Sequence, residues 1–252
     1  MITALDKYVA EFIGTMLLIL FGDGVVANVV LPKTKGNMGW GGGAWITITA
    51  GWAWAVAVGV YSVHWISGGY INPAVAIAGA ALGTLPWSEL LGYIIAEIAG
   101  AFVGALLVYV TYHDHYKESV RQGQDPVLRL ATFSTVPNIR NYPKNFITEV
   151  IGTFALELGV LTMISTSSLG PYASFFGAFL VALLVYGIGL SLGGPTGYAI
   201  NPARDLGPRI AHAILFHKES SDWHYAWVPI FGPIVGALLA ALVYHSFFAM
   251  IP

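Results

Sequence analysis

The 252-residue sequence contains no cysteine, and charged side chains make up only 10% of it, whereas hydrophobic residues make up 56%. The absence of cysteine excludes disulfides, thiolate chemistry and cysteine-ligated metals. A soluble domain has about 25% charged residues, so this composition indicates an integral membrane protein. The net charge of −2 and the absence of a basic stripe argue against nucleic acid as a partner.

Sequence signatures of enzymes are also missing. There is no glycine-rich phosphate loop, no HExxH motif and no credible pair of nucleophile and base. His113, Asp114 and His115 are potential metal ligands, but no further ligand is in sight, so a solvated loop is expected there. We therefore expect a protein that is not an enzyme and that uses no cofactor or metal.

Six apolar stretches are long enough to cross a bilayer, which takes about 20 residues. In chain order they are about Tyr8–Leu31, Ala44–Val63, Leu90–Tyr112, Phe146–Ser165, Ala173–Leu192 and Trp227–Met250. The first is interpreted as a span because it lacks the cleavage site of a removable signal peptide. The polar stretch Tyr112–Asn145 holds five of the eleven Lys and Arg residues and divides the chain into two halves.

Two copies of the tripeptide Asn-Pro-Ala lie between these spans. Their residues are Asn72, Pro73, Ala74, Asn201, Pro202 and Ala203. Asn is a favoured N-cap, and Pro fits the next position because its missing N–H is not needed there. Each copy therefore predicts the start of a short helix, over about Asn72–Gly83 and Asn201–His212. Both helices are too short to span a bilayer.

The two halves of the chain repeat each other. Glu11 and Glu149 each begin the pattern Glu-x-Ile-Gly-Thr, and Gly100–Leu107 matches Gly232–Leu239. Each half has three spans, an odd number, so the second half is inserted upside down. The two short helices then enter from opposite faces, with their N-termini directed at each other. Irregular backbone at that depth survives only where protein buries it or a watery cavity faces it, which predicts a pore.

This arrangement resembles the aquaporin superfamily over essentially the whole chain, and Asp205 directly after Arg204 is similar to its glycerol-facilitator branch. The resemblance implies an all-α membrane protein. Six transmembrane helices in two inverted repeats surround two re-entrant half-helices that meet at the bilayer midplane. We expect a single domain over residues 1–252, with repeats at about 1–113 and 144–252 joined by the loop 112–145.

By the same resemblance, Trp52, Gly189, Tyr198 and Arg204 form the selectivity filter. Gly189 is expected to leave an opening, Trp52 and Tyr198 to form an apolar wall, and Arg204 to donate to solute hydroxyls. Arg204 opposes the helix macrodipole, and its alternative is an arginine that snorkels to the interface. The alternative for Trp52 is a lipid-facing side chain. Many aquaglyceroporins have Phe in place of Tyr198, which leaves the preferred solute open.

Backbone carbonyls before the two Asn-Pro-Ala motifs are expected to form a ladder of acceptors along the pore. They belong to Gly68, Gly69, Tyr70, Ile71, Gly197, Tyr198, Ala199 and Ile200. The resemblance implies that Glu11 and Glu149 lie buried behind these loops and hold their amides, because an intramembrane carboxylate needs partners or a function. A carboxylate that faces a polar cavity for another reason is the alternative. Asp23, Glu97 and Glu157 have no assigned role.

The function implied is a passive channel for glycerol and other small neutral solutes, with water, that excludes ions and protons. Dihydroxyacetone, urea, hydrogen peroxide and small undissociated acids stay open as preferred solutes. A water-only channel is one alternative, which Gly189 argues against. An ion-coupled transporter is another, and it needs a titrating carboxylate in the path, for which Glu97 and Glu157 are the candidates.

The implied setting is the cell membrane of a bacterium, where a multi-pass homotetramer has one pore per subunit and cytoplasmic termini. The charge pattern disagrees with that orientation. The loops placed outside carry Lys33, Lys35, Lys218 and the basic residues of the long connection, whereas the positive-inside rule expects them inside. We follow the resemblance, because the filter arginine has to lie on the outer side to work as the family's filter does.

Overall fold

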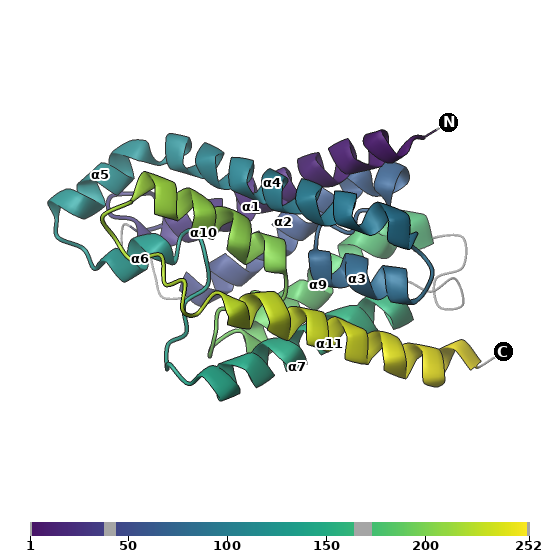
Figure 1. Ribbon diagram of the computed structural model, residues 1–252. Helices are drawn as coiled ribbons and strands as arrows, with labels where there is room; N and C mark the ends of the chain where they lie inside the picture. Colours follow the sequence, from purple (N-terminus) through teal and green to yellow (C-terminus); the bar gives the residue numbers. More distant parts are fainter. Residues whose placement is uncertain (1, 38–43, 164–172, 251–252) are drawn as a thin grey trace.

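The computed structural model describes residues 2–37, 44–163 and 173–250, and every regular element in these ranges is a helix (Figure 1). Five of these helices are long and apolar enough to cross a membrane. They are α1 (Ala4–Val30), α2 (Ala44–Ser67), α4 (Trp87–Thr111), α7 (Tyr142–Met163) and α11 (Trp227–Ser246). The sixth predicted span is α9 (Ala173–Leu192), whose bounds are those expected from the sequence. The predicted end of the fourth span at Ser165 lies outside the described residues.

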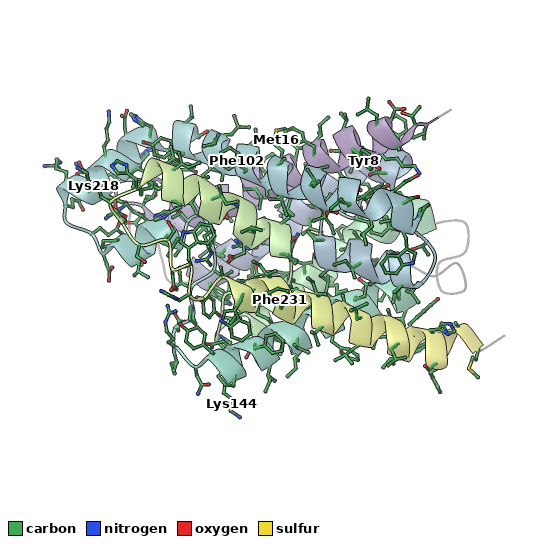
Figure 2. The ribbon with its side chains drawn as sticks, in the orientation of Figure 1. Tyr8, Met16, Phe102, Lys144, Lys218 and Phe231 are labelled. Atoms are coloured by element: carbon green, nitrogen blue, oxygen red, sulfur yellow. The ribbon has the colours of Figure 1, made fainter. Side chains whose placement is uncertain are left out.

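The outer surface of this bundle carries many exposed apolar side chains. Trp65, Leu91 and Val110 expose 72%, 67% and 70% of their area, which suits lipid and not water. Figure 2 labels Phe231 on α11, which exposes 55% of its area. The apolar exterior and the helix lengths together confirm the predicted membrane protein.

The two short helices begin where the Asn-Pro-Ala motifs predict. They are α3 (Pro73–Ala81) and α10 (Pro202–Leu215), and their N-caps are Asn72 and Asn201. Figure 1 shows that both begin near the centre of the molecule and run toward opposite ends. The predicted half-helices are therefore confirmed, with α10 three residues longer at its C-terminus than expected (215 against 212).

The long polar connection contains two helices that the sequence analysis did not predict. They are α5 (His113–Arg121) and α6 (Pro126–Leu130), and a final 3-10 turn, η2 (Phe248–Met250), follows α11. The segment of His113, Asp114 and His115, expected as a loop, is the first turn of α5, and the His115 ring nitrogen lies 3.0 Å from the carbonyl of Pro32. In Figure 1, α5 and α6 lie at the end opposite both chain termini.

Glycines bring the long helices of each half into close contact. A methyl group added at Gly100 of α4 would collide with the Phe12 carbonyl of α1. At the equivalent place in the second half, a methyl group at Gly236 of α11 would collide with the Val150 carbonyl of α7. In a membrane, small residues stabilise such contacts because they let helix backbones approach closely. The same helix pairing therefore recurs in both halves, around the central motifs.

Candidate functional site

A cavity of about 290 Å³ lies in the centre of the bundle, where α3 and α10 begin. It is lined by Gly68–Asn72, by Gly197–Asn201 and by Arg204. All eight residues predicted to present carbonyl groups are therefore among its lining. Much of the remaining lining is aliphatic, with Leu18, Val56, Val60, Val75, Val181 and Val185. The site is thus a narrow path with polar backbone in an otherwise apolar surround.

The two motif asparagines hold the halves of the chain together at the middle of this path. The amide nitrogen of Asn72 donates to the Ile200 carbonyl at 2.8 Å, and that of Asn201 donates to the Ile71 carbonyl at 2.8 Å. Each side-chain oxygen caps its own helix, at 3.0 Å from the backbone N–H of the Ala in its motif. An amide NH2 has two N–H donors. Each asparagine therefore keeps one more donor on a residue that lines the cavity.

The segments before the asparagines adopt backbone conformations that side chains usually avoid. Ile71, Tyr198 and Ile200 have φ of 45°, 39° and 44°, in the left-handed region where a bulky residue is strained. Such strain costs of order 1–3 kcal/mol per residue and persists only when surrounding structure holds it. These segments therefore lie on the cavity wall without forming a helix or a strand.

Two buried glutamates hold those strained segments. The Glu11 carboxylate accepts from the backbone N–H groups of Tyr70 at 3.0 Å and Ile71 at 2.6 Å. In the second half, Glu149 accepts from Ala199 at 3.0 Å and Ile200 at 2.9 Å. Both carboxylates therefore lie behind the loops and bind their amides, as predicted. Because the glutamates bind these N–H groups, the backbone groups that remain for the cavity are carbonyl acceptors.

Glu97, which the sequence left without a role, belongs to the same support. Its carboxylate accepts from the backbone N–H of Asn72 at 3.1 Å, and its side chain is fully buried. Glu97 does not line the cavity, whereas Glu157 does. Of the two carboxylates considered for ion coupling, only Glu157 therefore lies on the path.

Three of the four predicted filter residues line the cavity, and two of them, Trp52 and Arg204, contact each other. Trp52, Tyr198 and Arg204 all line it and are buried, with 5%, 7% and 6% of their area exposed. The Arg204 guanidinium carbon lies 4.3 Å from the centre of the Trp52 ring, a cation–π contact. Its Nη1 donates to the Phe133 carbonyl at 3.3 Å. A snorkelling Arg204 and a lipid-facing Trp52 are therefore both excluded.

Gly189 is the fourth predicted filter residue, and it was expected to leave an opening in the path. It does not line the cavity. A Cβ at this position would lie 2.8 Å from Cζ of Tyr198 and 2.7 Å from Cγ2 of Thr49. The Tyr198 ring thus occupies the space left by the missing side chain, so the absence of a Cβ at Gly189 sets the position of that ring. Trp45 binds the same segment, since its Nε1 donates to the Gly189 carbonyl at 2.9 Å.

Asp23 is a functional candidate that the sequence analysis left unassigned. It is fully buried in α1, and its Oδ1 lies 3.8 Å from Nη1 of Arg204. Neither carboxylate oxygen accepts a hydrogen bond from the described part of the chain. The signal in the sequence was an acidic residue inside a span, which needs a partner in the bundle, but the partner is remote in the sequence.

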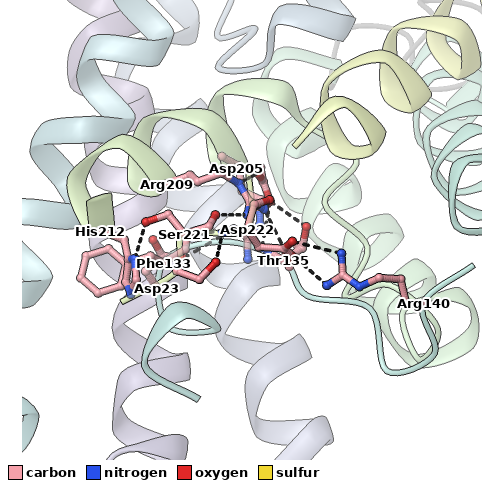
Figure 3. A network of polar contacts seen from close by, with 11 residues as sticks. Asp23, Phe133, Thr135, Arg140, Asp205, Arg209, His212, Ser221 and Asp222 are labelled. Atoms are coloured by element: carbon pink, nitrogen blue, oxygen red, sulfur yellow. Dashed lines mark hydrogen bonds and ion pairs between the residues drawn. The ribbon is translucent and has the colours of Figure 1, made fainter. Parts of the chain in front are cut away.

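Asp205 of α10 binds the long connection, residues 112–145, through Thr135 (Figure 3). Its Oδ2 accepts from the backbone N–H of Thr135 at 2.8 Å and from the Thr135 hydroxyl at 2.7 Å. Nε of Arg209 donates to Asp205 Oδ1 at 2.8 Å, and Nη1 of Arg209 donates to the Ser221 carbonyl at 2.7 Å. This network holds the segment that supplies the Phe133 carbonyl, which the sequence did not reveal as part of the filter.

Comparisons with known proteins agree with this geometry. The profile of the family described as "Major intrinsic protein" matches residues 1–244. The chain is 56% identical to the "Probable glycerol uptake facilitator protein" of Thermotoga maritima, over 97% of this chain and 100% of that protein. It is 48% identical to the "Glycerol uptake facilitator protein" of Streptococcus pneumoniae, over 96% and 100%. The X-ray structure of the aquaglyceroporin from Plasmodium falciparum aligns with a TM-score of 0.86 at 28% identity, covering 98% of this chain and 97% of that one.

Proposed function

This chain belongs to the major intrinsic protein family, and from that premise we propose that it is a passive channel for glycerol and other small neutral solutes. Water passes with them, and ions and protons are excluded. The protein is a channel and not an enzyme. The similarity to proteins named as glycerol uptake facilitators over nearly their full length supports glycerol as a solute.

The observation that carries this proposal is that aromatic and polar groups line the same cavity. Trp52 and Tyr198 present aromatic surface, Arg204 presents donors, and the backbone before Asn201 presents carbonyl acceptors, all on one cavity. A small polyol has carbon on one side and hydroxyls on the other, so it satisfies both kinds of wall at once. An ion loses its hydration there without an equivalent replacement, and burying an unpaired charge is costly.

Cations meet a second obstacle at the centre. The N-termini of α3 and α10 face each other there, and each carries roughly half a positive charge. The Asn72 and Asn201 side chains present donors at the same place. A hydronium ion, which is a donor only, finds no favourable partner between these groups.

An ion-coupled transporter would need a moving element and a titrating group in the path. The reciprocal bonds of Asn72 and Asn201 tie the two halves at the point where such a transporter would have to open. Glycerol flux is therefore expected to be the same with and without a proton or sodium gradient. Flux that follows either gradient would favour the transporter.

The experiment that tests the channel compares water, urea and glycerol permeability in proteoliposomes by stopped-flow light scattering. All three are expected to exceed the values of empty liposomes. Tyr198→Phe is expected to keep or raise the glycerol value, because the Tyr198 hydroxyl has no hydrogen-bond partner in the described part of the chain. Glycerol permeability no higher than that of empty liposomes would leave a water-only channel.

The assembly and setting form part of the same proposal. A homotetramer in a bacterial cell membrane, with one pore per single-domain subunit and cytoplasmic termini, is expected of the family. Figure 1 supports a shared side for the termini, since both lie at one end of the molecule. Native mass measurement in mild detergent tests the tetramer, and protease access to a C-terminal tag in intact and inverted vesicles tests the orientation.

A further inference from the structure

Glu157 is a buried carboxylate that no structural bond explains. It is 2% exposed, and its Oε2 accepts no hydrogen bond from the residues that the structure describes. The other buried glutamates, Glu11, Glu97 and Glu149, all accept from backbone amides. A carboxylate withdrawn from water without a partner is costly, so its presence in the path calls for a ligand.

The side chain lies on the wall of the pore. Leu156, Glu157, Val160 and Leu161 of α7 all line the cavity, and their spacing places them on one face of a helix. The same lining contains no Lys or Arg other than Arg204 among the described residues. Among the described lining residues, Arg204 is therefore the only permanently charged cation that Glu157 shares the cavity with.

Glu157 lies in the half of the pore remote from the filter. The residues just before α7 are fastened to the filter side, because Arg140 pairs with Asp222 at 2.6 Å within the network around Asp205 (Figure 3). Glu157 follows Glu149 by two helical turns, about 12 Å along the axis. Figure 1 shows α7 running from the end with α5 and α6 toward the end with the chain termini.

We propose that Glu157 forms, with the carbonyl groups before Asn72, a second solute-binding position in this half of the pore, for neutral molecules with at least two hydrogen-bond donors. The inference rests on the proposed passage of such solutes. Carbonyls of Gly68–Ile71 line the same cavity, so a polyol can donate to them and to the carboxylate at once. A carboxyl group accepts hydrogen bonds in either protonation state. The wall around Glu157 is otherwise aliphatic and suits the carbon chain of a polyol.

Competition between glycerol and water in the pore measures this binding directly. Vesicles equilibrated with the same glycerol concentration on both sides are given an osmotic step with impermeant sucrose, and water efflux is recorded. Glycerol that occupies the pore slows water, so the concentration that halves water flux reports its affinity. For the wild type we expect clear inhibition. Glu157→Met, which keeps the length of the side chain but removes its strong acceptor, should raise that concentration about three- to tenfold.

Two further variants separate binding from other effects. Glu157→Gln keeps an acceptor oxygen and should give an intermediate value. Leu161→Met places the same side chain on the same wall without removing an acceptor, and should behave as the wild type. Equal glycerol inhibition in the wild type and Glu157→Met, or no inhibition in the wild type, would overturn the binding position. Water flux shows that each variant is folded and open, and glycerol influx into wild-type vesicles tests the proposed function separately.

Discussion

Asp23 and Arg204 form an ion pair inside the membrane region, with Oδ1 and Nη1 3.8 Å apart and both side chains buried. Arg204 also lies over Trp52 and donates to the Phe133 carbonyl. Arg204, which we propose as the filter arginine, thus has three partners: a charge, an aromatic ring and a backbone acceptor. Its own charge is partly balanced by Asp23, so the filter is less positive than an isolated arginine would make it.

Breaking this pair from one side is expected to be costly. Arg204→Leu leaves Asp23 buried without a counter-charge, and we expect a loss of about 3–5 kcal/mol in the free energy of unfolding. Asp23→Leu should be costly for the same reason, whereas Asp23→Leu/Arg204→Leu should lose much less than the sum of the two. Thermal unfolding in detergent, followed by tryptophan fluorescence, gives the ranking. Additive losses would mean that the two side chains do not stabilise each other.

The parts of the site that the sequence could predict are those that local chemistry and the repeat define. An Asn before Pro is a helix N-cap signal in the local sequence, as at Asn72 and Asn201. The repeat identified Glu11 and Glu149 as equivalent positions, and their supporting role was implied by the family resemblance. Contacts between remote segments were beyond its reach. Nothing near Asp23 in the sequence names Arg204 as its partner.

The neighbour of Gly189 is a related case. A missing side chain predicts space, but the sequence does not say which neighbour takes it, and here Tyr198 does. The helices α5 and α6 were missed because the long connection was read from its polarity alone. Asp125, which accepts from the N–H of Val127, and Pro126 after it are the cap signals that were available for α6.

Gly189 offers a direct test of how the Tyr198 ring sets the width of the pore. In Gly189→Ala the new methyl group would lie 2.8 Å from Tyr198 Cζ and 2.7 Å from Thr49 Cγ2. These distances are too short for carbon atoms that are not bonded, so the ring has to move. Gly189→His should move it further. We expect glycerol permeability to fall several-fold in Gly189→Ala and to vanish in Gly189→His, while water permeability is largely kept.

The control for this series is Gly187→Ala in the same helix, where an added Cβ has nothing within 4 Å. It should leave both permeabilities unchanged. Stopped-flow light scattering with glycerol and with sucrose gives both values for each variant. Glycerol permeability that stays at the wild-type value in Gly189→His would show that Tyr198 does not narrow the path.

Replacing Glu149 is expected to lower the free energy of unfolding more than removing any one of its hydrogen-bond donors. Its carboxylate accepts from the N–H groups of Ala199 and Ile200 and from the Thr196 hydroxyl at 2.6 Å. Glu149→Gln keeps one acceptor oxygen and turns an NH2 group toward a backbone N–H. We expect a loss of about 1–3 kcal/mol, measured by thermal unfolding in detergent. Thr196→Val removes only one donor and should cost less, and equal losses would contradict the role assigned to the carboxylate.

Proton exclusion should depend on the net charge of the filter and not on Arg204 alone. Wild-type vesicles are expected to hold a pH gradient, because the half-helix N-termini and Arg204 together repel cations. Arg204→Leu leaves Asp23 as the nearest charge, so the local field changes sign and protons should leak. Asp23→Leu/Arg204→Leu removes both charges and should leak less, although it too lacks the arginine. Decay of a pH gradient, reported by an entrapped dye, ranks the three proteins. A double variant that leaks as fast as Arg204→Leu would show that Asp23 does not contribute to the field at the filter.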